Sequence, residues 1–120
     1  RDAVHRRNLA ALMLFDPESI TEWALRRHGA NVVRDRMKGR SLSRTDVLVQ
    51  SLARVQCPVY AIYGREDALY RGLGERLAPA LQRAPGFKSL TWIEASGHWV
   101  QFEQADAFNA ALLAALNADL

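Results

Sequence analysis

The sequence Val59-Tyr60-Ala61-Ile62-Tyr63-Gly64-Arg65-Glu66-Asp67 begins with five apolar residues, reaches a glycine and then turns polar. Valine, isoleucine and tyrosine favour extended structure, and an unbroken apolar run is typical of a parallel strand that is buried on both faces. We therefore predict a strand over 59–63 that ends at Gly64. Asp67 then lies just beyond the carboxyl end of that strand.

A second strand is predicted over 89–93, and each strand is followed by a helical pattern. Leucine or phenylalanine recurs on one side of both stretches, which predicts helices over 71–83 and 105–116. Pro85-Gly86 marks the turn before the second strand. The order strand, helix, strand, helix predicts two parallel strands that are joined by a right-handed crossover.

The first half of the chain has no strand pattern and consists of predicted helices and loops. We expect a helix over 2–15, a second that starts at Asp16-Pro17-Glu18 and weakens at Gly29, and a third that a capping box of Ser43 and Asp46 begins. The chain therefore divides into a helical segment, residues 1–54, and an α/β segment, residues 55–120.

Two parallel strands cannot form a stable core, because a pair leaves open edges and parallel sheets need helices on both faces. We therefore expect the C-terminal part of a larger α/β protein, whose further strands precede Arg1. The missing N-terminal part would be needed for a stable core.

Composition excludes several kinds of partner. The 120 residues carry a net charge of +3, but the arginines are scattered without interleaved aromatics, so nucleic acid is not an expected partner. The longest apolar run, 9–15, is too short to cross a bilayer, so no membrane partner is expected either. Cys57 is the single cysteine, which excludes an internal disulfide. We expect Cys57 to be a small buried hydrophobe and the protein to be cytoplasmic.

His98, in the sequence Ser96-Gly97-His98-Trp99, follows the second predicted strand as Asp67 follows the first. Alone, Asp67 would be interpreted as a turn or cap residue, and His98 as a loop histidine bonded to a backbone carbonyl. Neighbouring parallel strands lie about 5 Å apart, however, and functional groups gather beyond their carboxyl ends. We therefore predict that Asp67 contacts His98 as an acid/base pair.

Such a pair needs a nucleophile. A carboxylate on one imidazole nitrogen fixes the tautomer, and the other nitrogen can then take a proton from a hydroxyl. The chain contains no Gly-x-Ser-x-Gly sequence, and Ser41, Ser43 and Ser96 do not follow a strand at a sharp turn into a helix. Since the nucleophile precedes the acid and the histidine in sites of this order, we expect it upstream of Arg1. The 120 residues alone are expected to be inactive.

The chain resembles the α/β-hydrolase superfamily. The resemblance depends on residues 63–67 after a buried strand, and on Gly97-His98-Trp99 followed by Phe102-Glu103 and a helix. It covers residues 57–120, while residues 1–56 look like the tail of the helical lid that many members carry. One departure is Ala68-Leu69-Tyr70-Arg71-Gly72, since many members place a proline a few residues beyond the acid.

The resemblance implies a serine hydrolase that acts on an ester or related small carbonyl substrate without a cofactor or metal. Asp67 would be the triad acid, His98 the base, and Trp99 would line the substrate pocket. Residues 97–104, with Leu14-Phe15-Asp16-Pro17, are also similar to hydrolases that cleave carbon–carbon bonds in ring-fission products. Those enzymes hold a substrate carboxylate with a lid arginine; the candidates, none of them assigned, are Arg26, Arg27, Arg34 and Arg36. A non-catalytic binding module of the same fold stays open as well.

Overall fold

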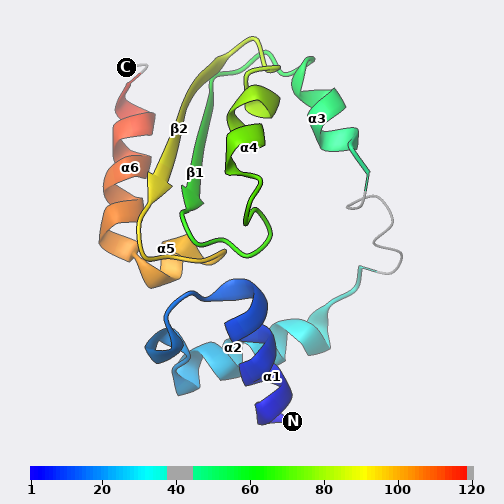
Figure 1. The fold of residues 1–120 in the computed structure, drawn as a ribbon, viewed down its shortest axis with the longest axis vertical. Coiled ribbons are helices and arrows are strands. Elements are labelled where there is room, and N and C mark those ends of the chain that lie inside the picture. Colours follow the sequence, from blue (N-terminus) through cyan, green and yellow to red (C-terminus); the bar gives the residue numbers. More distant parts are fainter. Residues whose placement is uncertain (38–44, 119–120) are drawn as a thin grey trace.

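The computed structural model describes residues 1–37 and 45–118 as a mixed α/β structure (Figure 1). The first half contains α1 (Asp2–Asn8), a π-helical turn η1 (Leu9–Met13), a 3-10 turn η2 (Pro17–Ser19), α2 (Glu22–Arg34) and α3 (Val47–Leu52). The second half contains β1 (Val59–Gly64), α4 (Gly74–Leu81), β2 (Phe87–Ile93), α5 (Val100–Glu103) and α6 (Ala105–Asn117).

The two strands are parallel neighbours, as predicted. Tyr63 pairs with Trp92 and Gly64 with Ile93, so both strands end at the same edge of the sheet. β1 ends at Gly64 as expected, and β2 begins at Phe87, earlier than the sequence pattern indicated. The connection through α4 makes this a strand–helix–strand unit, and it brings the segments that follow β1 and β2 together at one end.

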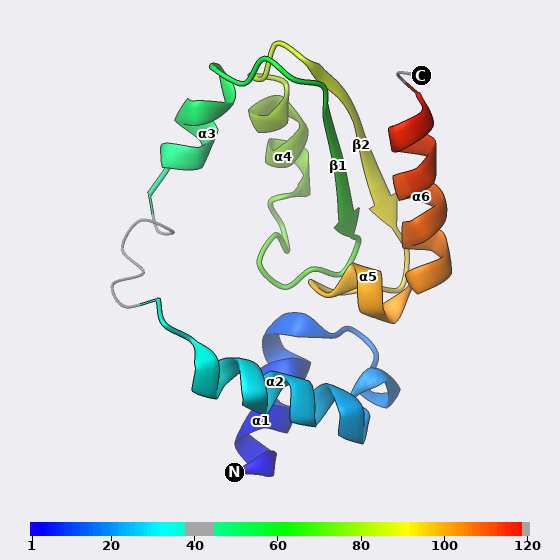
Figure 2. The same ribbon diagram turned by 180° about the vertical axis from the view of Figure 1, so that it is seen from behind.

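Helices α4 and α6 flank the strand pair (Figures 1 and 2). Alanines of α6 line one cavity together with Ile62 and Thr91, and Gly74 at the start of α4 lies against the Trp92 ring. Burial on both faces is not observed for β1, of which Ala61 and Gly64 alone are buried. No residue of α6 is buried, so the described residues leave the sheet only partly covered.

The N-terminal helices follow the sequence prediction with two corrections. Asp16 caps the short 3-10 turn rather than a long helix, because its side chain accepts the Glu18 N–H. The long helix α2 begins at Glu22, where the Thr21 hydroxyl accepts the Ala24 N–H as an N-cap. The weakening expected at Gly29 is not observed, since α2 continues through it to Arg34.

The third predicted helix is α3, which begins directly after Asp46 and contacts α4 (Figure 1). Within the described residues the Asp46 side chain makes no cap at this helix start, and Ser43, the other half of the predicted capping box, lies outside them. Cys57 is exposed rather than buried, because it lies in the loop before β1, where its carbonyl faces Gly86 of the turn before β2.

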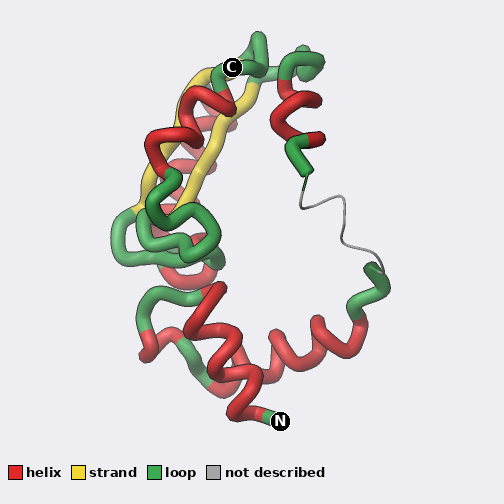
Figure 3. Tube along the Cα trace, turned by 45° about the vertical axis from the view of Figure 1, so that its right-hand side comes forward, coloured by secondary structure: helices red, strands yellow, loops and turns green. Residues whose placement is uncertain are grey.

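Helices α1 and α2 lie beyond the carboxyl ends of the strands, next to α5 (Figures 1 and 3). Buried side chains from residues 9–24 form one apolar cluster against which Trp99 and Phe102 pack; its members are Leu9, Leu14, Ile20 and Ala24. Trp23 of α2 stacks on Phe102 of α5 at 5.2 Å between ring centroids. The N-terminal helices are thereby attached to the end of the sheet where His98 lies.

Within residues 1–37 and 45–118, none of the helices combines the length and apolar character needed to cross a bilayer.

Candidate active site

The turn after β1 and the loop after β2 are joined through their backbones. The Arg65 N–H donates to the Ile93 carbonyl at 2.8 Å, and the Glu66 N–H donates to the Ser96 carbonyl at 2.9 Å. Asp67 follows directly, and its N–H donates to the carbonyl of Gly64 at 3.2 Å. These bonds hold the carboxylate at the edge of the sheet, beside the loop that carries the histidine.

Asp67 and His98 are in contact, as the sequence predicts. Nδ1 of His98 lies 2.8 Å from Oδ2 of Asp67, and Oδ1 of Asp67 accepts the N–H of Leu69 at 2.9 Å. Since an ionised carboxylate only accepts hydrogen bonds, we assign the imidazole proton to Nδ1. The Asp67 side chain is 3% exposed and the His98 side chain 37%. A buried anion therefore orients a ring that solvent or a substrate can reach.

Ser96 does not supply the nucleophile. Its side chain is fully buried, and its hydroxyl donates to the carbonyl of Ile93 at 2.8 Å. The hydroxyl thus supports the turn that leaves β2. The preceding Ala95 has φ of 52°, in the left-handed region that few non-glycine residues adopt.

Trp99 lies on the side of the histidine loop that faces the N-terminal helices. It packs on the apolar cluster that contains Leu9, and its ring is 6.4 Å from His28 and 6.3 Å from Phe102 in edge-on arrangements. Its backbone N–H donates to the carbonyl of Met13 at 2.9 Å. The structure therefore gives Trp99 packing partners in the N-terminal helices, and contact with substrate stays a prediction.

A cavity of about 610 Å³ opens beside Asp67. Its wall includes Tyr70 and Trp92, and the Arg65 guanidinium covers the Trp92 ring at 4.9 Å. Tyr63 lies behind Tyr70, with ring centroids 5.0 Å apart. Burial, the contact with Tyr70 and the nearby Asp67 charge together raise the pKa of Tyr63 to about 12. The sequence pattern indicates only an apolar strand residue at Tyr63 and gives no sign of a neutral phenol beside Asp67.

The sequence gives Glu103 no role in the site: Phe102-Glu103 contributes to the resemblance, but no pattern relates this carboxylate to residues 15 and 16. Its carboxylate accepts the backbone N–H groups of Phe15, Asp16 and Gly97, at distances of 2.8, 2.9 and 2.6 Å. The carboxylate therefore links the segment before η2 to the loop that carries His98.

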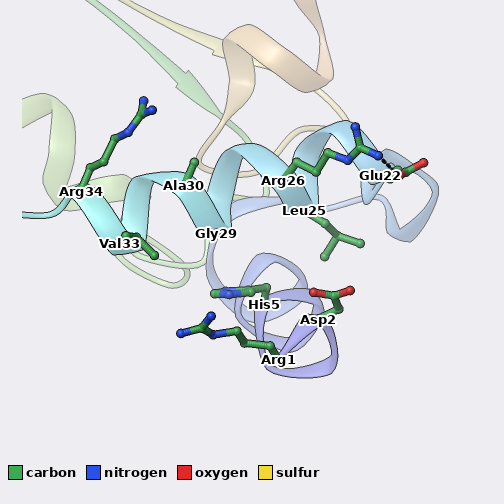
Figure 4. A pocket seen from close by; sticks show the side chains of 10 residues that line it. All are labelled: Arg1, Asp2, His5, Glu22, Leu25, Arg26, Gly29, Ala30, Val33 and Arg34. Carbon is green, nitrogen blue, oxygen red and sulfur yellow. Dashed lines mark hydrogen bonds and ion pairs between the residues drawn. The ribbon is translucent and has the colours of Figure 1, made fainter.

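The candidate arginines lie on α2 or just after it. Arg26 pairs with Glu22, and Arg27 covers the ring of Trp23 at 5.2 Å. A cavity of about 520 Å³ between α1 and α2 is lined by Arg26 and Arg34 (Figure 4), and Arg36 is exposed after α2 ends. All residues that line this cavity belong to the N-terminal helices or to Arg1, and neither Asp67 nor His98 is among them. The cavity therefore gives no reason to assign one of these arginines to a substrate.

In the part of the chain that the structure describes, no three His, Cys, Asp or Glu side chains are grouped to hold a metal ion. No protein-family model matches the chain, and no curated protein matches it significantly.

Proposed function

We propose that this chain is the C-terminal part of a hydrolase of the α/β-hydrolase fold, with Asp67 as the acid and His98 as the base. The proposal depends on one observation, the 2.8 Å contact between Asp67 Oδ2 and His98 Nδ1 at the ends of adjacent parallel strands. The nucleophile would come from a strand that precedes Arg1 in the chain. The substrate class best supported is an ester or a related carbonyl compound.

In this mechanism Nε2 of His98 removes the proton of the nucleophilic hydroxyl. At the same time the hydroxyl oxygen bonds to the carbonyl carbon of the substrate. The imidazolium so formed is stabilised by the Asp67 carboxylate and gives its proton to the departing alkoxide. Water then attacks the acyl-enzyme with His98 again as the base, and the carboxylic acid product is released. General-base assistance of this kind contributes about 10²–10⁴-fold in rate.

The surroundings of the pair support a hydrolase site. Asp67 is buried and His98 is partly exposed, which is what an orienting acid and a reacting base require. The N-terminal helices lie over the carboxyl ends of the strands, where the active sites of open α/β sheets are found. The partly covered sheet and the exposed Leu113 and Leu116 of α6 fit a core that further strands and helices would complete.

Carbon–carbon bond cleavage of ring-fission products is the second candidate, on the sequence similarity of residues 97–104 and of Leu14-Phe15-Asp16-Pro17. The residue at the nucleophile position separates the broader alternatives. A serine supports either hydrolase, an aspartate supports a dehalogenase or an epoxide hydrolase, and a glycine or alanine supports a non-catalytic binding module.

The test is hydrolysis of short-chain p-nitrophenyl esters by the polypeptide that includes the proposed upstream strands. His98→Ala is expected to lower turnover by at least about 100-fold, while circular dichroism stays unchanged. Glu94→Gln is the matched control, because Glu94 pairs with Arg65 in the same region but is 75% exposed. Undiminished turnover in His98→Ala would contradict the proposal.

A further inference from the structure

His98 is held from both sides by one segment, residues 13–16, which leads from η1 to η2. The residue before it, Gly97, donates its N–H to Oε2 of Glu103 at 2.6 Å, and Glu103 in turn binds this segment. The residue after it, Trp99, donates its backbone N–H to the carbonyl of Met13 at 2.9 Å. The backbone of His98 is therefore fixed with respect to residues 13–16, although more than 80 residues separate them in the chain.

The two oxygens of Glu103 serve different segments. Oε1 accepts the N–H groups of Phe15 and Asp16, at 2.8 and 2.9 Å, while Oε2 accepts that of Gly97. Hydrogen bonds to a carboxylate are about twice as strong as those between neutral groups. A carboxylate at this position therefore joins two segments that are far apart in the chain.

Packing at Gly97 makes this junction tight. A β-carbon on Gly97 would lie 2.9 Å from the Met13 carbonyl oxygen and 3.0 Å from the Phe15 nitrogen. The histidine loop and residues 13–16 are thus in backbone contact, and a shift of either one moves the other. A displacement of His98 by about 1 Å is enough to cost about 100-fold in a positioned reaction.

We propose that Glu103 is a positioning residue, whose carboxylate sets the imidazole of His98 against Asp67 by coupling the histidine loop to residues 13–16. Its catalytic consequence depends on the function proposed above, but the effect on the imidazole does not. A change in the position of the N-terminal helices therefore changes the geometry of the acid/base pair, and the reverse also holds.

Glu103→Gln tests this coupling at almost unchanged volume. A glutamine has one accepting oxygen and one donating NH₂ group, so it can bind the Phe15 and Asp16 amides or the Gly97 amide, but not both. Glu94→Gln is the control, since it removes one carboxylate whose partner among the described residues is Arg65 rather than residues 13–16. Glu103→Asp, which keeps the charge at a shorter reach, is the second variant.

The first readout is the NMR signal of the proton on Nδ1 of His98, which ¹⁵N-resolved spectra of the imidazole detect. We expect a protected downfield signal in the wild type and in Glu94→Gln, and loss of that signal by solvent exchange in Glu103→Gln. The second readout is ester hydrolysis by the complete polypeptide, where kcat should fall about 10- to 100-fold with little change in KM. Glu103→Asp should give an intermediate result in both.

An unchanged Nδ1 signal in a folded Glu103→Gln variant would overturn the proposal. Unfolding of both Glu103 variants, judged by circular dichroism, would also overturn it, since the residue would then be needed for the fold as a whole. A signal that responds to Glu103→Gln in a protein without esterase activity would support positioning and contradict the proposed function.

Discussion

Gly64 and Gly97 face each other so closely that a β-carbon on Gly64 would lie 2.1 Å from the carbonyl oxygen of Gly97. Gly64 ends β1 and Gly97 precedes His98. This contact therefore sets how near the turn that carries Asp67 comes to the loop that carries His98. No rotamer change can relieve the overlap, because the backbone alone fixes the positions of the β-carbon and of the carbonyl oxygen. The absence of a β-carbon at Gly64 therefore lets the carbonyl of Gly97 approach β1 this closely, beside the hydrogen bond of 2.8 Å between Asp67 and His98.

Gly64→Ala is expected to destabilise the protein by at least about 1–3 kcal/mol, because the loop after β2 must move away from β1. The measurement is urea unfolding, together with the Nδ1 proton signal of His98, which should weaken. Gly74→Ala is the matched control. Its β-carbon would meet the Trp92 ring at an ordinary 3.7 Å, and alanine in place of a glycine without positive φ stabilises by about 0.4–1 kcal/mol. Equal stability of the two variants would contradict this account of Gly64.

Asp67→Asn should leave the fold intact and reverse the imidazole tautomer. The amide oxygen of the new side chain can still accept the Leu69 N–H, while its NH₂ group donates to Nδ1 of His98, which then loses its proton to Nε2. In the proposed hydrolase, turnover of an ester substrate should fall on the order of 10⁴-fold, as expected for the wrong tautomer of the histidine base. The ¹⁵N shifts of His98 check the tautomer directly. A proton that stays on Nδ1 would contradict the prediction.

The sequence was sufficient to predict this contact because it depends on topology. Two apolar strands in a strand–helix–strand order must be parallel neighbours, and residues just beyond their ends must meet at one edge. Asp67 and His98 are placed by that rule alone. In residues 55–120 the predicted strands and the two predicted helices also agree with the structure within a few residues at their ends, where local hydrogen bonds rather than periodicity decide.

Contacts between distant segments could not be predicted in the same way. Glu103 binds Phe15 and Asp16 because the apolar cluster around Leu9 brings α1 and α2 against Trp99 and Phe102. No periodic pattern relates residues so far apart in the chain. The weakening expected at Gly29 is not observed, because a single glycine in a helix costs only about 1 kcal/mol and α2 packs on α1.

The ionisation of Tyr63 gives a third prediction. Its raised pKa of about 12, compared with about 10 in an unfolded chain, means that the folded state keeps its proton while the unfolded state loses it. Stability that this tyrosine contributes is therefore complete below about pH 10 and is lost as the pH rises towards 12. Absorbance at about 295 nm, where tyrosinate absorbs, should show a tyrosine that titrates late, and Tyr63→Phe should remove that step. A late step that persists in Tyr63→Phe would contradict the assignment.

His28 is a buried histidine between the N-terminal helices and the histidine loop. Within the described part of the chain its Nε2 is buried without a hydrogen-bond partner, and its ring lies edge-on to His5 of α1 at 5.2 Å and to Trp99 at 6.4 Å. Burial lowers the pKa of His28, and the nearby His5 charge lowers it further. Protonation of His28 therefore places a buried charge where the N-terminal helices pack against the loop that carries His98.

The sign of the effect follows from this lowered pKa of His28. Between its folded-state value and the unfolded value of about 6.5, the unfolded chain binds more protons, so the free energy of unfolding decreases as the pH falls through that window. One proton accounts for at most about 1.4 kcal/mol per pH unit. His28→Leu should remove this slope in urea unfolding between about pH 7.5 and 5 and should retain the apolar contact with Trp99. His5→Gln should reduce the slope by less, because it removes the smaller of the two causes. A slope that survives in His28→Leu would mean that another group destabilises the N-terminal helices in acid.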